Sequence, residues 1–159
     1  MNLKEQLRAS LSELAPFSHG TQLLEATEGS RQLRVELSAL DRLACALDRL
    51  SLIVDALRAA RPDRLKQVAQ RLSESLTYLL EPISPIELDA HGCTVQMRSN
   101  PPQKEADCTT YYELLVQDTG ELSLCRYMRP VAQDRTRIPA EITREVLLRL
   151  VGDFAAAAS

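Results

Sequence analysis

The sequence is poor in the residue types that build many catalytic and cofactor sites. Trp is absent and aromatic residues make up only 4% of the 159 residues, so a core must be built mainly from Leu, Val, Ile and Ala. None of the five Gly forms the Gly-rich strand-to-helix turn that holds a phosphate, which argues against Rossmann and P-loop chemistry. The two His lack a recognisable nucleophile motif such as Gly-x-Ser-x-Gly. From the sequence we therefore predict no catalytic residue and no cofactor, and we favour a non-enzymatic function.

The cysteines lack the spacing of a metal site. Cys45, Cys93, Cys108 and Cys125 include no Cys-x-x-Cys pair and match no zinc finger or ribbon. Residues 1–14 mix charged and apolar side chains, which is not typical of a signal peptide. We therefore predict no metal, free thiols and a cytoplasmic location.

Neither a basic excess nor a long apolar run is present. The net charge is −3 and the isoelectric point is near 5.5, whereas nucleic-acid binders usually carry a basic stripe. No run approaches the ~20 apolar residues that a membrane helix needs. We expect no nucleic-acid or membrane partner. Sixteen of the nineteen basic residues are Arg, which, with many Ala and Leu, is typical of a high-GC bacterial genome.

Three amphipathic segments predict helices. Apolar residues recur at helical spacing over residues 2–14, 63–80 and 140–156. Asn2 can cap the first helix and Pro16 ends it. Pro62 suits the start of the second helix and Pro82 ends it. Pro139 can open the third helix, which we expect to lie on a sheet.

Residues 86–98 predict a hairpin. A turn at His91-Gly92 places Leu88 opposite Val95, Ile86 opposite Met97 and Ala90 opposite Cys93, with all six on one face. A one-residue slip would mix the two faces, so the pattern selects this register. The predicted strands are 86–90 and 93–98.

Residues 110–128 predict a second hairpin, with strands 110–117 and 121–128. Asp118-Thr119-Gly120 has the letters of an aspartic protease motif, but no second such loop supplies the paired carboxylate that the chemistry needs. A three-residue loop instead places Val116 opposite Leu122 and Leu114 opposite Leu124, with Gly in the left-handed position. Tyr111 then opposes Tyr127. The motif is predicted to be a turn.

Residues 20–60 allow two interpretations. Leucines spaced over residues 40–57 are typical of a helix. Alternatively, strand 31–37 pairs with 22–27 through a turn at Glu28-Gly29, which sets Leu24 opposite Leu33, and strands 43–47 and 50–55 flank a turn at Asp48-Arg49. Short matches such as LSLIV at 50–54 and LSLCR at 122–126 suggest a degenerate internal repeat and favour the strands. The chain is then a single domain, 1–159, with two similar halves, 1–60 and 61–159.

Two groups of residues are candidates for a site. Tyr111, Leu115 and Tyr127 make the outer face of the second hairpin unusually apolar, so either the C-terminal helix or another chain should cover it. Asp89 and His91, beside Cys93, are weaker ligand candidates at a turn. Five arginines late in the chain could bind an acidic partner: Arg98, Arg126, Arg129, Arg135 and Arg137.

The sequence therefore predicts an α+β fold, with an antiparallel sheet packed by helices. The expected architecture and acidic charge resemble those of the type III secretion chaperones, which bind other chains as dimers; no residue motif carries the resemblance. The first functional hypothesis is a protein-interaction or chaperone-like module, with another chain or a second copy as partner. The alternative is a small enzyme or ligand-binding domain with a site near Asp89, His91 and Cys93.

Overall fold

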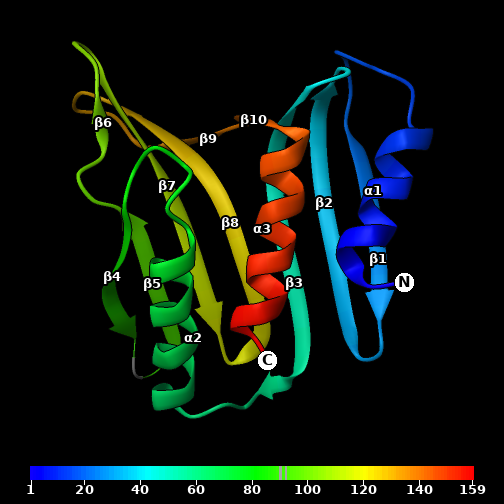
Figure 1. The fold of residues 1–159 in the computed structure, drawn as a ribbon. Coiled ribbons are helices and arrows are strands. Elements are labelled where there is room, and N and C mark those ends of the chain that lie inside the picture. The colour runs from blue at the N-terminus through cyan, green and yellow to red at the C-terminus, as the bar shows by residue number, and fades with distance from the viewer. Residues whose placement is uncertain (90, 92) are drawn as a thin grey trace.

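Three helices pack on one face of an antiparallel sheet in the computed structural model, which describes residues 1–89, 91 and 93–159 (Figure 1). The helices are α1 (Leu3–Glu13), α2 (Pro62–Ser75) and α3 (Arg144–Ala157). The first strands are β1 (Gln22–Glu28), β2 (Arg31–Leu40), β3 (Ala44–Arg58), β4 (Ile83–Asp89) and β5 (Thr94–Ser99). The later strands are β6 (Gln103–Lys104), β7 (Cys108–Gln117), β8 (Thr119–Pro130), β9 (Thr136–Ile138) and β10 (Ala140–Thr143). The predicted α+β class is confirmed.

The sheet runs in the order β1-β2-β3-β8-β7-β5-β4, so β1 and β4 are its outermost long strands. Strands β3 and β8 pair over Leu50–Ile53 and again where Arg58 faces Thr119, and they diverge at the other end, before Leu50 of β3 and after Leu124 of β8. The chain fills the gap between them, because β9 pairs with β8 and β10 pairs with β3. Helix α3 lies between α1 and α2 (Figure 1).

The core lies between the helices and the sheet face that they cover, which we call the inner face. Its side chains are almost all aliphatic, as the shortage of aromatic residues requires. One cluster joins helix residues such as Leu7, Leu72 and Phe154 to strand residues such as Leu50 and Leu124. Both ends of the sheet therefore share one core.

The second predicted hairpin is confirmed in every pair that we named. Strands β7 and β8 place Val116 opposite Leu122, Leu114 opposite Leu124 and Tyr111 opposite Tyr127. Gly120 has φ +92°, and a Cβ built on it would lie 2.7 Å from the carbonyl oxygen of Val54. The Asp-Thr-Gly motif therefore lies at the tight connection from β7 to β8, with Asp118 between the strands and a Gly that serves the backbone.

The first predicted hairpin is confirmed in part. Leu88 faces Val95, but Pro85 and not Ile86 faces Met97, because an extra residue bulges out of β4 between Pro85 and Glu87. The strand also begins earlier, at Ile83. The predicted pair of Ala90 with Cys93 and the turn at His91-Gly92 involve residues 90 and 92, which lie outside the described residues.

Residues 40–57 form strands and not a helix, but the predicted turn at Asp48-Arg49 is wrong. Strand β3 runs without a break from Ala44 to Arg58, and the chain turns instead before Ala44. Asp48 is an extra residue between the pairs Leu37–Leu47 and Glu36–Arg49. This bulge shifts the alternation by one residue, so Leu47 and Leu50 both reach the core.

The first turn of the sheet is displaced by one residue from its predicted place. The chain turns at Gly29-Ser30, so Leu24 faces Val35 and Ala26 faces Leu33. Gly29 has φ +61°, a conformation that Gly adopts at no steric cost.

The end of one helix and the start of another also differ from prediction. Helix α2 ends at Ser75, not at residue 80, and Leu76 and Leu79 reach the core from an irregular segment. Tyr78 in this segment donates a hydrogen bond to Asp153 of α3 at 2.6 Å. Helix α3 begins at Arg144, not at residue 140, because Thr143 caps it by accepting from the Val146 N–H, while Ala140–Thr143 pair with β3.

The two matching sequence segments meet at the centre of the sheet. Leu50 faces Leu124, Ser51 faces Ser123, and Leu52 faces Leu122. The strands on one side of this seam come from the first part of the chain and those on the other from the second part. The internal repeat itself stays a prediction.

Candidate functional site

The sheet face opposite the helices, here called the outer face, contains the residues predicted to bind a partner. Tyr111, Leu115 and Tyr127 alternate with inward-facing residues such as Leu114 and Leu124 and so lie on this face. Helix α3 packs on the inner face (Figure 1). The C-terminal helix therefore does not cover these residues, contrary to one of our two expectations.

Arginines lie over the tyrosines instead. The rings of Tyr111 and Tyr127 stack with centroids 6.0 Å apart. The guanidinium of Arg98 lies 4.8 Å from the Tyr111 ring centroid, and that of Arg135 lies 3.9 Å from the Tyr127 ring centroid. Cation–π contact of this kind fixes both partners while leaving guanidinium N–H groups at the surface.

A buried carboxylate anchors the two arginines. Glu113 is only 5% exposed and lies 2.5 Å from Arg135 Nη1 and 3.5 Å from Arg98 Nη2. Gln96 Nε2 donates to the same carboxylate at 2.8 Å. Burial alone would raise the pKa of Glu113, but the hydrogen bonds from Arg135 and Gln96 and the two arginine charges lower it overall. Glu113 therefore stays ionised at neutral pH.

Two further arginines extend this surface. Arg129 and Arg137 are both exposed. Arg129 lies opposite Thr109 of β7, and Arg137 lies opposite Tyr127 of β8. A cavity of about 350 Å³ lies between Arg98, Arg129 and Tyr111, bounded also by Thr109, Ser99, Asn100 and Pro102. We call the whole surface the Tyr–Arg patch, made of Arg98, Tyr111, Glu113, Tyr127, Arg129, Arg135 and Arg137.

Arg126 does not belong to this surface, although it is close in sequence. It faces Tyr112 on the neighbouring strand, and its guanidinium lies 4.4 Å from that ring. It also donates to Glu81 at 3.0 Å, in an ion pair whose side chains are 13% and 10% exposed. Arg126 therefore ties the segment after α2 to the sheet, and only four of the five late arginines share the outer face.

The residues of the second candidate group lie at the end of β4 and in the connection that follows it. Asp89 Oδ1 accepts a hydrogen bond from the His91 backbone N–H at 3.0 Å, which is ordinary turn geometry. Partial burial and the carboxylates of Asp118 and Asp89 raise the pKa of Cys93. A raised pKa disfavours the thiolate that a nucleophile or metal ligand requires.

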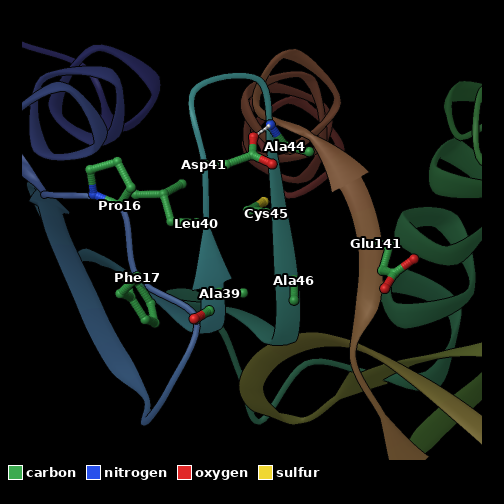
Figure 2. A pocket seen from close by; sticks show the side chains of 10 residues that line it. Pro16, Phe17, Ala39, Leu40, Asp41, Ala44, Cys45, Ala46 and Glu141 are labelled. Atoms are coloured by element: carbon green, nitrogen blue, oxygen red, sulfur yellow. Dashed lines mark hydrogen bonds between the residues drawn. The ribbon is translucent and has the colours of Figure 1, made fainter.

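A second cavity, of about 560 Å³, lies where β2 ends and β3 begins. Figure 2 shows Ala39, Ala44 and Ala46 between Phe17 on one side and Glu141 on the other. Burial raises the pKa of Cys45 to about 11. The backbone N–H groups of Ala44 and Leu43 donate to Asp41 and lower the pKa of its carboxyl. The cavity is thus lined by a protonated thiol, on Cys45, and by a carboxylate, on Asp41, that already accepts two backbone hydrogen bonds within a turn.

Sequence reasoning found the tyrosines but missed the buried carboxylate beneath the arginines. The pairing of Arg98 with Glu113 depends on β5 lying beside β7, which no local turn specifies. Arg135 reaches Glu113 from the connection between β8 and β9. The five arginines between residues 98 and 137 indicated that this surface would be positively charged, but not which of them would meet Glu113.

Within the described residues, no group of three or more His, Cys, Asp or Glu side chains could hold a metal ion, and no helix is long and apolar enough to cross a membrane. Comparison with family models, with curated proteins and with solved structures finds no match for this chain.

Proposed function

We propose that this protein is a non-enzymatic, chaperone-like protein-binding module and that the outer face of its sheet is the binding surface. The observation that carries the proposal is the stacked pair Tyr111–Tyr127, held by arginines on the face that the helices leave uncovered. Tyr and Arg are enriched in protein interfaces, because they offer large contact areas and several hydrogen bonds from few rotatable bonds.

The protected edges of the sheet favour binding through its face. Gln6 of α1 donates from Nε2 to the Thr27 carbonyl at 2.6 Å and accepts from the Thr27 N–H at 3.3 Å, so it occupies the open edge of β1. At the opposite edge, β4 contains Pro85, a bulge and the acidic residues Glu87 and Asp89. Prolines, bulges and charges all discourage the addition of another strand.

The enzyme hypothesis, with a site near Asp89, His91 and Cys93, has less support. The pKa values of three thiols, Cys45, Cys93 and Cys125, are raised, chiefly by burial, so these cysteines are poor nucleophiles. A mostly protonated thiol suits a structural role in the reducing cytoplasm, which we propose as the location.

The resemblance to type III secretion chaperones adds the proposal that the protein acts as a homodimer. Size-exclusion chromatography with light scattering tests this directly, since the chain mass is 17.7 kDa. We expect twice that mass at micromolar concentration. A monodisperse monomer would contradict a dimeric chaperone but leave monomeric binding open.

The binding surface itself can be tested by site-specific photo-crosslinking. A benzophenone amino acid replaces Leu115, which is half-buried on the outer face. The control replaces Arg8, which is exposed on α1. We expect Leu115 to crosslink a defined protein, or a second copy of this chain, in extract from the native host, and Arg8 to crosslink neither.

The crosslinked protein is then purified, and its affinity is measured by calorimetry for the wild type and for Tyr127→Ala. We expect Tyr127→Ala to weaken binding at least tenfold, as loss of a central aromatic contact does. Equal crosslinking from Leu115 and Arg8, or unchanged affinity, would overturn the assignment of the outer face.

A further inference from the structure

We propose that the Tyr–Arg patch binds an acidic segment of a partner protein, through Asp or Glu side chains seated against Arg98 and Arg129. This inference rests on the proposed function and names the chemistry of the partner. It is carried by charge, by the arrangement of the arginines and by the cavity between them.

The charge of the patch is opposite to that of the whole chain. Four arginines and one glutamate give the patch a net charge of +3, whereas the chain carries −3. The single carboxylate, on Glu113, is 5% exposed and already accepts from Arg135 and Gln96. It does not also neutralise Arg129, which is exposed, whereas Arg137, also exposed, lies near the carboxylate of Glu36. The patch therefore presents unneutralised positive charge to the solvent at Arg129.

The arginines are prearranged to bind carboxylates. Arg98 and Arg135 are 37% and 38% exposed, and each lies over a tyrosine ring. In addition, Arg98 Nε is buried and makes no hydrogen bond to the part of the chain that the structure describes. Stacking fixes each guanidinium, so little side-chain entropy is lost when its N–H fork meets a carboxylate.

The cavity beside Arg98 has the size of a side-chain pocket. Its volume is about 350 Å³, and the polar residues that line it include Arg129, Thr109 and Asn100. Tyr111 and Pro102 supply apolar surface. An Asp or Glu side chain could therefore be held by charge at its end and by contact along its stem.

A protein segment fits these features better than a nucleic acid. A polyanion needs a long basic stripe, and the overall charge of −3 repels it at long range. The Tyr–Arg patch is compact and adjoins Leu115, which gives an apolar contact next to the charges. A short protein segment that mixes acidic and apolar residues matches both the arginine charges and the apolar contact at Leu115.

Fluorescence anisotropy tests the inference with a labelled twelve-residue peptide of alternating Glu and Leu, and with a matched peptide in which every Glu is replaced by Gln. We expect the Glu peptide to bind at least tenfold more tightly at 50 mM salt and to lose most of this advantage at 500 mM, because salt screens exposed charges. Equal affinity of the two peptides would overturn the inference.

A charge-matched pair of variants locates the site. Arg129→Gln with Arg137→Gln removes two exposed charges and leaves the partners of Glu113 intact. Arg8→Gln with Arg61→Gln removes two exposed charges elsewhere. We expect the first variant to weaken the Glu peptide at least tenfold and the second less than threefold. Equal weakening would show a non-specific charge effect and overturn the site.

Two further outcomes separate this inference from the proposed function. A single-stranded RNA that binds the patch more tightly than the Glu peptide at 150 mM salt would overturn the assignment to a protein. A partner that crosslinks at Leu115 and binds the Arg129→Gln, Arg137→Gln variant as well as the wild type would support the outer face but contradict the acidic segment.

Discussion

At the scale of single residues, Glu113 is the most consequential polar side chain of the outer face. It pairs with Arg98 and Arg135 and lies two residues from Tyr111 on the same face of β7, in a buried position where an unpaired charge would be costly. Its role is to position Arg98 and Arg135, so the geometry of the proposed binding surface depends on a group that the partner would scarcely touch.

We predict that Glu113→Gln lowers the free energy of unfolding by about 1–3 kcal/mol, because the arginines lose a buried charged partner. Urea denaturation measures the change. Glu121→Gln is the control, since Glu121 is 25% exposed and pairs with Arg49 at 2.6 Å; it should cost less than about 1 kcal/mol. An equal effect of the two substitutions would contradict the anchoring role of Glu113.

The same residue predicts a pH dependence. The pKa of Glu113 lies below the ordinary value of 4.5, so its contribution is present above pH 4.5 and is lost as the pH falls through the lower folded value. The stability difference between the wild type and Glu113→Gln should therefore shrink in acid. A difference that stays constant down to the acid transition would contradict this sign.

Gly120 supplies a second prediction at this scale. Both Gly120 and Gly29 have positive φ, but only Gly120 would place a new Cβ against a backbone atom, the Val54 carbonyl oxygen at 2.7 Å. We expect Gly29→Ala to cost about 1–2 kcal/mol, the price of the left-handed conformation, and Gly120→Ala to cost clearly more, because the backbone must also shift. Thermal unfolding measures both, and equal costs would show that the contact with Val54 is relieved easily.

At the scale of elements, the sequence predicted the features that depend on residues close together in the chain, such as tight turns and helix caps. Alternation and a Gly fixed the register of β7 and β8, and the capping box of Asn2 with Glu5 confirms the predicted start of α1. The errors fall where a bulge or a tertiary pairing intervenes. The alternation around Asp48 predicts a turn because a bulge and a turn both shift the alternation by one residue. The pattern of residues 140–143 predicts helix because their strand partner, β3, is distant in sequence.

The edge contact of Gln6 leads to a prediction about α1 and β1. Gln6→Ala removes both hydrogen bonds to Thr27 and should lower the free energy of unfolding by about 0.5–2 kcal/mol. Hydrogen exchange should report faster exchange at the Thr27 amide. Arg8→Ala, on the same helix but exposed, serves as control and should leave that amide unchanged. An unaltered Thr27 amide in Gln6→Ala would contradict the role of Gln6 at the edge.

At the scale of the whole molecule, the sheet joins the two parts of the chain into one core. The pairings of β3 with β8 and of β5 with β7 decide both the fold and the Tyr–Arg patch, and they rest on contacts between distant segments. The sequence could therefore predict the tyrosines and the sign of the charge beside them, but not that Arg98, Glu113 and Arg135 would meet.

A shared core predicts cooperative unfolding. All four tyrosines lie after residue 77, so their fluorescence reports on the second part of the chain, whereas Leu7 lies in α1 and is 2% exposed. Leu7→Ala should lower the free energy of unfolding by about 2–5 kcal/mol. We expect the transitions followed by tyrosine fluorescence and by far-ultraviolet circular dichroism to shift together. A tyrosine transition that stays in place would show two independent units.

The central seam, in which Leu-Ser-Leu of β3 faces Leu-Ser-Leu of β8, is self-complementary. Either tripeptide occupies a place that a copy of itself would fit, since antiparallel pairing about Ser51 and Ser123 makes the two partners equivalent. A fragment that ends after β3 would expose this Leu-Ser-Leu edge, and the same edge of a second copy could pair with it in the register that β8 occupies in the whole chain.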